Sequence, residues 1–346
     1  MPTNNIGLDG MEFAEFSSSQ PDHLARLFKE FGFSKLMDHQ SLKISAFSQG
    51  GIHLLLNQHA GSFAESFHQQ HGPSIASMGW RVKDPQAALD IAVNRGAKSI
   101  KGDYQDSSGA PIPAIKGIGD SIIYFVQAGQ GTEVLKSIGF DQSAHPDKVP
   151  GKGFTYLDHL TNNVPKGSMS YWSDFYKKIF DFEEVRYFDI RGAKTGLTSY
   201  ALRSPCGKFC IPINEGTEDE SQINEYLREY KGAGVQHLAF LTEDIVASVR
   251  GLKGTTIQTL DIDDQYYEEV FDRVPNVSED HKVLQDLNIL VDGDKEGYLL
   301  QIFTKNVVGP IFIEIIQRKN HLSFGEGNFG ALFRSIERDQ EKRGVL

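Results

Sequence analysis

Three residues in the C-terminal half of the chain have the side-chain types of a metal site. His159 lies in Leu-Asp-His-Leu-Thr, His237 in Val-Gln-His-Leu-Ala and Glu314 in Ile-Phe-Ile-Glu-Ile-Ile. They are separated by 78 and 77 residues. A carboxylate in apolar surroundings is costly unless it is protonated, paired with a cation or bound to a metal. Two imidazoles and one carboxylate on one face of an ion leave three adjacent positions open, as non-haem Fe(II) oxygen chemistry requires.

Strand periodicity predicts that these three side chains point into one cavity. Each lies in a run of β-branched and aromatic residues, which is typical of a strand. Alternation along a strand puts each candidate ligand on one face with its neighbours two residues away: His159 with Leu157 and Thr161, His237 with Val235 and Ala239, and Glu314 with Phe312 and Ile316. The alternative is a pair of satisfied core histidines and a glutamate paired with Arg318 or Lys305. His53, also in an apolar run, shows that residue types alone leave this alternative open.

Four segments that share one pattern must position these residues. Each has a short apolar strand, an amphipathic helix that ends near Gly, and further strands. In the first segment, Leu24, Leu27, Phe28 and Phe31 form a helical stripe at i, i+3, i+4 and i+7. The predicted opening strands are Met11–Phe16, Ser74–Val82, Phe154–Val164 and Gly234–Leu241.

Two such segments in each half predict an α+β fold. We expect two pseudo-symmetric halves, each an open β-barrel around a cavity and each built from a pair of βαβββ modules. The predicted domains are residues 1–130, without a metal site, and residues 153–346, which carry the catalytic site. Residues 131–152 are polar and interrupted by Gly and Pro, so they are interpreted as a linker. The final segment, 323–343, is predicted to be a helix.

Comparison of the two predicted halves suggests that only one of them carries a site. Alignment of the modules places Glu12 opposite His159, Met78 opposite His237 and Tyr124 opposite Glu314. These three residues form a poor metal site. The first half is therefore interpreted as a structural or subunit-contact half.

Composition excludes several classes of partner. The 346 residues carry a formal net charge of -11 without any block of Lys and Arg, which argues against binding to nucleic acid or to an anionic membrane. Cys206 and Cys210 are too few for a disulfide framework or a zinc site. The N-terminal residues lack the pattern of a signal peptide, and no apolar run approaches about 18 residues. We therefore expect a cytoplasmic protein.

Longer motifs add a family resemblance that covers essentially the whole chain. The chain resembles the 4-hydroxyphenylpyruvate dioxygenases, Fe(II) enzymes of the vicinal-oxygen-chelate fold. One small departure is Ser323, where the family usually has Gly. The matching segments are Leu157–Val164, Gly234–Phe240, Leu300–Phe303, Gly309–Arg318 and Phe324–Phe333.

The resemblance implies an activity and a cofactor. His159, His237 and Glu314 would hold Fe(II), which the substrate would chelate through its carboxylate and keto oxygens. The reaction would convert 4-hydroxyphenylpyruvate and O2 into homogentisate and CO2 by decarboxylation, ring hydroxylation and migration of the side chain. The family also implies a homodimer or homotetramer, formed through the N-terminal half.

The same resemblance implies the residues around the substrate. Amide side chains are uncharged groups that can orient a phenol without binding iron. Asn214, Gln236 and Gln301 are the expected catalytic residues. Phe329 and Phe333, four residues apart on the last helix, would make that helix a lid that excludes water. The full expected substrate-binding set is Ser199, Asn214, Gln222, Gln236, Gln301, Phe303, Phe312, Phe329 and Phe333.

Three other functions use the same fold or the same ligand types. A 4-hydroxymandelate synthase shares the iron site and substrate but hydroxylates the benzylic carbon. The segment Pro212–Glu215 and Phe333 favour ring hydroxylation instead. An extradiol ring-cleaving dioxygenase would accept a catechol and release no CO2. A non-catalytic binding protein of this fold would bind no iron.

Overall fold

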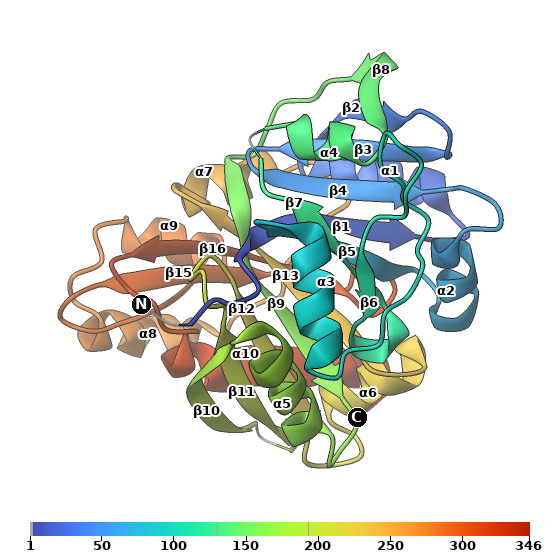
Figure 1. Cartoon of the computed structure of the whole chain (residues 1–346). Helices are drawn as coiled ribbons and strands as arrows, with labels where there is room; N and C mark the ends of the chain where they lie inside the picture. The colour runs from blue at the N-terminus through green and yellow to red at the C-terminus, as the bar shows by residue number, and fades with distance from the viewer. Residues whose placement is uncertain (1–2, 130, 193) are drawn as a thin grey trace.

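The fold consists of two similar curled sheets with helices packed around them (Figure 1). The structure is a computed structural model that describes residues 3–129, 131–192 and 194–346. Strand order is β6-β7-β5-β1-β4-β3-β2-β8 in the first sheet and β10-β11-β12-β9-β13-β16-β15-β14 in the second. The α+β fold of two similar open-barrel halves is therefore confirmed.

The strands of each sheet belong to one half of the chain. The first sheet contains β1 (Leu8–Ser17), β2 (Ser34–His39), β3 (Ile44–Gln49), β4 (Ile52–Asn57), β5 (Ser74–Val82), β6 (Ala114–Lys116), β7 (Ile122–Gln127) and β8 (Phe140–Asp147). The second contains β9 (Phe154–Val164), β10 (Glu183–Arg191), β11 (Gly196–Arg203), β12 (Cys210–Gly216), β13 (Gly234–Thr242), β14 (Leu290–Gly293), β15 (Tyr298–Phe303) and β16 (Phe312–Lys319). In both sheets an antiparallel pair of opening strands, β1–β5 or β9–β13, joins the two modules.

Capping residues and prolines in the local sequence set the ends of several helices. Pro85 follows Asp84, whose side chain caps the first turn of α3 by accepting from two backbone N–H groups. Five helices, α2, α4, α6, α8 and α9, have no sequence prediction. The helices are α1 (Pro21–Glu30), α2 (Phe63–His71), α3 (Pro85–Asn94), α4 (Glu133–Ser137), α5 (Met169–Phe180), α6 (Gln222–Tyr230), α7 (Ile245–Gly251), α8 (Asp264–Arg273), α9 (His281–Asp286) and α10 (Phe329–Lys342).

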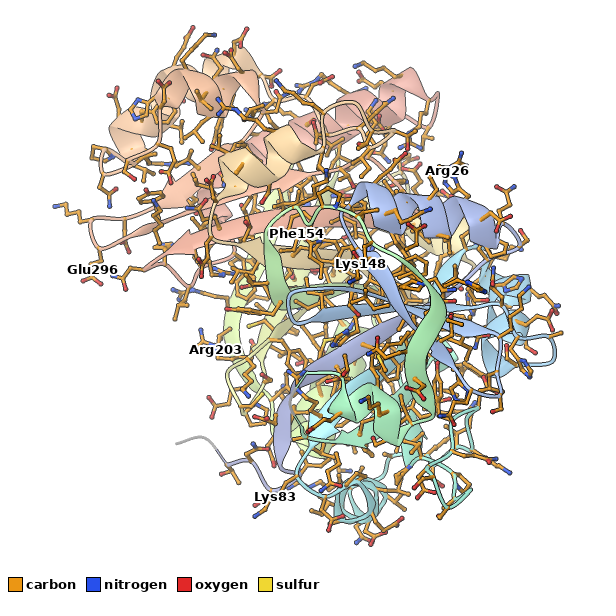
Figure 2. All side chains as sticks on the ribbon, turned by 90° about the horizontal axis from the view of Figure 1, so that it is seen from above. Arg26, Lys83, Lys148, Phe154, Arg203 and Glu296 are labelled. Carbon is orange, nitrogen blue, oxygen red and sulfur yellow. The ribbon has the colours of Figure 1, made fainter. Side chains whose placement is uncertain are left out.

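The range 131–152, interpreted from sequence as a linker, contains regular structure. Helix α4 and strand β8 lie within it, and β8 pairs with β2 at the edge of the first sheet. Leu135 and Phe140 are buried there. Most of the few apolar residues of this range are buried in the first half. They are widely spaced in a polar segment, so they show neither the period of a strand nor that of a helix. Figure 2 labels Lys148 and Phe154 on the passage into the second half.

The strand register corrects the predicted alignment of the two halves. In the second half His159 pairs with Ala239, whose other neighbour is Glu314. In the first half Phe13 pairs with Gly79, whose other neighbour is Tyr124. Phe13 and Tyr124 therefore stand where the second half has His159 and Glu314. The prediction for Tyr124 agrees with this register, whereas that for Glu12 is wrong by one residue.

The same register also moves the counterpart of His237. His237 pairs with Thr161, and the equivalent pair in the first half is Ser77 with Glu15. Ser77, not Met78, therefore corresponds to His237. A shift of one residue turns every side chain of a strand to the opposite face, which explains why a one-residue error selects the wrong set. The first half presents Phe13, Ser77 and Tyr124 at these positions, and these residues do not form a group of metal ligands.

The hydrophobic core is continuous between the halves. One cluster of buried side chains contains residues from both sheets. Trp80 of β5 packs against Phe180, Phe182 and Phe209 of the second half, with ring centroids 4.6, 6.0 and 5.4 Å away. This packing holds the second sheet, and the cavity inside it, in a defined position. Within the described ranges no helix is long and apolar enough to cross a membrane.

Candidate metal centre

Three adjacent strands bring His159, His237 and Glu314 together. They lie on β9, β13 and β16, which are neighbours in the second sheet. The His159 Nε2 and His237 Nε2 atoms are 3.0 and 3.4 Å from Glu314 Oε2, and 3.4 Å from each other. All three side chains are buried, and one ligand atom from each lies within 4.8 Å of the others. Ala239, between His159 and Glu314 on the middle strand, has a small side chain that leaves this space open.

Two β-bulges orient the histidines. The register of β9 and β13 shifts by one residue at Asp158 and again at Gln236. A bulge re-aims a side chain, and here the residue before each histidine reaches the histidine ring. His159 Nδ1 donates to Asp158 Oδ2 at 2.8 Å, and His237 Nδ1 donates to Gln236 Oε1 at 3.0 Å. With Nδ1 protonated, Nε2 of each ring is the free donor atom for a metal.

Glu314 is oriented by an amide. Gln301 Nε2 donates to Glu314 Oε1 at 2.9 Å, so Oε2 faces the two imidazoles. Arg318, considered from sequence as a partner of Glu314, instead forms two hydrogen bonds of 2.7 and 2.8 Å with Asp158. The carboxylate therefore has no Lys or Arg partner among its described contacts, and the donor set of two imidazole nitrogens and one carboxylate oxygen fits a divalent transition metal.

The electrostatics of the cluster favour a bound cation. Burial alone would lower the pKa of His159, but Glu314 and Asp158 raise it to about 9. Burial would raise the pKa of Glu314, but the two histidines lower it to about 2. For His237 burial dominates and lowers the pKa. In the absence of an ion, the cluster holds one proton between His159 and Glu314 near neutral pH, and a divalent cation bound by the same atoms would displace it.

The Asp158–Arg318 pair offers a test of this arrangement. We expect Asp158→Asn to lower the affinity of the protein for a divalent metal by about 10- to 100-fold, because His159 loses the charged acceptor that fixes its ring. Competition with a chromophoric chelator measures this affinity. Asp141→Asn, at an exposed aspartate of β8, is the control and should bind metal like the wild type. Equal affinities for Asp158→Asn and the control would contradict the orienting role.

A cavity adjoins the three candidate ligands. Its wall contains all three candidate ligands and every substrate-binding residue that the sequence suggested: Ser199, Asn214, Gln222, Gln236, Gln301, Phe303, Phe312, Phe329 and Phe333. The ring of Phe312 stacks on His237 with centroids 4.7 Å apart. The cavity thus brings together residues from seven strands and two helices.

Several lining residues have no sequence prediction. Alternation on the strands could have found some of them, because Ile190 follows Phe188 by two residues, and Leu197 precedes Ser199 by two. The full additional set is Phe188, Ile190, Leu197, Pro212, Phe324, Leu332 and Ile336, whereas Thr161 lines the cavity as predicted from its place on one face with His159. The bulges also correct two expected neighbours. Leu157 lines a separate hollow with Glu12 and Arg81, and Gln236 rather than Val235 lines the cavity beside His237.

Family models match both halves of the chain. Residues 3–141 match "Hydroxyphenylpyruvate dioxygenase, HPPD, N-terminal", and residues 156–301 match "Glyoxalase/Bleomycin resistance protein/Dioxygenase superfamily". The first match includes α4 and ends at the start of β8.

Full-length relatives support the same assignment. The chain is 55% identical to Protein MelA of Shewanella colwelliana, over 99% of both chains. It is 44% identical to 4-hydroxyphenylpyruvate dioxygenase of Pseudomonas aeruginosa, over 99% of this chain and 97% of the relative. A solved mutant of 4-hydroxymandelate synthase from Streptomyces coelicolor has the same fold, with a TM-score of 0.83, 24% identity and coverage of 98% of this chain and 100% of that one. The chain therefore belongs to the 4-hydroxyphenylpyruvate dioxygenase family of Fe(II) dioxygenases, with His159, His237 and Glu314 as the group that could bind the metal.

Proposed function

We propose that this protein converts 4-hydroxyphenylpyruvate and O2 into homogentisate and CO2. The observation that carries the proposal is the position of the three ligands in an apolar, largely aromatic cavity. Among the described residues that line this cavity there is no Lys or Arg. A cation at the ligand cluster would therefore be the positive charge that attracts the carboxylate of a 2-oxo acid, which agrees with chelation of the substrate at the metal.

The protein's own residues would bind and orient the substrate. Fe(II) at the cluster would supply the coordination sites for the keto acid and O2 and the redox chemistry that couples decarboxylation to hydroxylation. Ser199 and Asn214 face each other across β11 and β12, and Asn214 Nδ2 donates to Asn163 Oδ1 at 3.3 Å. We assign Ser199, Asn214 and Gln222 to the phenol end of the substrate, because, unlike Gln236 and Gln301, they form no described hydrogen bond with a candidate metal ligand.

Gln236 and Gln301 would act closer to the ligands. Gln236 accepts a hydrogen bond from His237, and Gln301 donates one to Glu314. We propose that these amides set the orientation of the ligands and thereby the geometry of the chelated keto acid. This role differs from direct binding of the phenol, and it predicts that changes at Gln301 weaken metal binding as well as turnover.

The aromatic wall would keep water away from the reacting atoms. Phe329 and Phe333 project from α10 into the cavity, and Phe333 is packed with Ile190, Leu197 and Ile223. Such a wall would exclude water, so that oxidation would be directed to the bound ring. The helix would thus act as a lid over the substrate.

Truncation of Phe333 tests the lid. We expect Phe333→Ala to lower kcat/KM by about 10- to 100-fold, because the ring no longer holds the substrate in place and water enters. We also expect more CO2 release than homogentisate formation. Measurement of O2 uptake, CO2 and homogentisate in one assay gives both quantities. Lys342→Ala, at an exposed position of the same helix, is the control. A variant that keeps one homogentisate per CO2 would contradict the proposed exclusion of water.

Product analysis separates the alternatives. Incubation with 4-hydroxyphenylpyruvate, Fe(II) and ascorbate, followed by chromatography, should give homogentisate. 4-Hydroxymandelate as the product would overturn the proposal and favour the synthase, whose fold the chain shares. Turnover of a catechol without CO2 would indicate an extradiol enzyme. Absence of both bound iron and turnover would indicate a binding protein. The homodimer or homotetramer and the cytoplasmic location stay predictions.

A further inference from the structure

A chain of hydrogen bonds connects Glu314 to the base of α10. Asn328 Nδ2 donates to Gln301 Oε1 at 3.0 Å, and Gln301 Nε2 donates to Glu314 Oε1 at 2.9 Å. Behind Asn328, the Tyr266 hydroxyl donates to Asn328 Oδ1 at 2.6 Å. Tyr266 lies on α8, and Asn328 is the residue immediately before α10. All of these side chains are buried. The chain therefore runs from α8 through the base of the lid to the metal carboxylate.

The donors in this chain all point in one direction. The Val291 backbone N–H donates to the Tyr266 hydroxyl at 2.7 Å, so the hydroxyl has one proton left to donate, and Asn328 Oδ1 at 2.6 Å is nearer than the Val291 carbonyl at 2.8 Å. With Oδ1 occupied as an acceptor, Asn328 presents its NH2 group to Gln301. Gln301 in turn presents its NH2 group to the carboxylate. Each bond selects one of the two orientations of the next amide, and the opposite orientation would place an amide oxygen against the Glu314 anion.

The loop before α10 is also in close contact with Gln301. Gln301 Nε2 donates to the Phe324 carbonyl at 3.2 Å. Gly325 has a φ of +80°, and a Cβ atom there would lie 2.0 Å from Gln301 Oε1. Phe324 packs edge-on against His159, with ring centroids 5.9 Å apart. Movement of this loop would therefore break the contacts that fix Gln301.

We propose that Tyr266 and Asn328 are positioning residues that couple the closed position of α10 to the orientation of Glu314. The inference rests on the metal-binding role of Glu314 in the proposed function. Closure of the helix places Asn328 against Gln301, which aims the carboxylate at the histidines. A metal that binds more tightly when the Glu314 carboxylate points at the histidines must, by thermodynamic linkage, also favour the closed position of α10. The two effects are equal in free energy.

A pair of adjacent tyrosines provides a matched test. Tyr267, also buried on α8, donates its hydroxyl to the Ile289 carbonyl at 3.1 Å and does not contact Asn328 among its described bonds. Tyr266→Phe and Tyr267→Phe each remove one buried hydroxyl. Titration of the metal-free, full-length proteins with Co(II), followed by visible absorption, gives the metal affinity. Hydrogen exchange over residues 325–342, with and without Co(II), reports the closure of α10.

The expected results separate coupling from a loss of stability. Tyr266→Phe should bind Co(II) about tenfold more weakly than the wild type, at the lower end of the range for groups that orient metal ligands. Co(II) should protect α10 less in this variant. Tyr267→Phe should match the wild type in both measurements. Asn328→Asp, which keeps the acceptor for Tyr266 but loses the donor to Gln301, should weaken Co(II) binding in the same direction and serves as a second variant if Tyr266→Phe folds poorly.

Three outcomes would overturn the inference. The first is equal Co(II) affinity in Tyr266→Phe and Tyr267→Phe. The second is protection of α10 by Co(II) that is unchanged in Tyr266→Phe. The third is a wild-type protein that does not bind Co(II), which would remove the metal site on which the coupling depends. Homogentisate formation tests the proposed reaction separately, so an active enzyme with equal affinities would contradict the coupling alone.

Discussion

Glu314→Gln should eliminate turnover and weaken metal binding by more than 100-fold. A change in a group that only orients a ligand costs about 10- to 100-fold in metal affinity, and Glu314 is itself the only carboxylate of the cluster. The amide has nearly the same shape but carries no charge. Oxygen uptake with 4-hydroxyphenylpyruvate measures the loss of turnover, and elemental analysis of protein reconstituted with Fe(II) measures the loss of metal.

The first half of the chain supplies the matched control for this substitution. Glu15 is also a buried carboxylate on a central strand, and it accepts hydrogen bonds from Asn57, Ser77 and Tyr104. Glu15→Gln should leave the metal content and the affinity for Fe(II) unchanged, because no histidine in the described part of that half joins it in a metal-binding group. Glu314→Gln protein that retained its iron and its activity would reject the proposed ligand set.

Trp80→Ala should destabilise the protein by about 3–5 kcal/mol, the range for removing a large aromatic side chain from a core. Trp80 is fully buried on β5 of the first half, and the rings around it, Tyr176, Phe180, Phe182 and Phe209, come from the second half. The cavity left by the substitution would thus lie between the halves. Urea unfolding followed by circular dichroism gives the change in the free energy of unfolding.

The same experiment tests whether the halves unfold together. Because their core is continuous, we expect a single transition in the wild type, shifted to lower urea concentration in Trp80→Ala. Val93→Ala, at a largely exposed position of α3, is the control and should change stability by less than about 0.5 kcal/mol. Two separate transitions in the wild type, with only one of them moved by Trp80→Ala, would show that the halves are independent.

Sequence pattern together with the family resemblance indicated the candidate metal-binding group and much of the fold. His159, His237 and Glu314 stand in apolar strands, where polar groups of these types are unusual, and long motifs surround them. The helices with a clear apolar stripe, such as α1 and α5, were predictable because their periodicity differs from that of a strand. Helices α8 and α9 were not predicted, although Tyr266, Tyr267 and Val270 form a buried face on α8.

The positions of the β-bulges could not be predicted from the sequence. A strand with regular alternation would place Leu157 beside His159 on one face, yet the extra residue at Asp158 turns Leu157 away and brings Asp158 to the histidine ring. The first half has bulges at the equivalent positions, Glu12 and Ala76, so Glu12 corresponds to Asp158 and not to His159. A bulge is visible only when the partner strand is known, because it is defined by the count of residues on both strands.

The amino-acid sequence by itself determined the ligand types, the repeated modules and the apolar faces, because these depend on side-chain chemistry and on short-range periodicity. The tertiary structure decided which side chains orient the ligands. Arg318 reaches Asp158 over 160 residues, and Tyr266 reaches Asn328 over 62 residues. Contacts at such separations depend on how the sheets curl and on where α8 and α10 pack against the second sheet, and no periodicity along the chain encodes them.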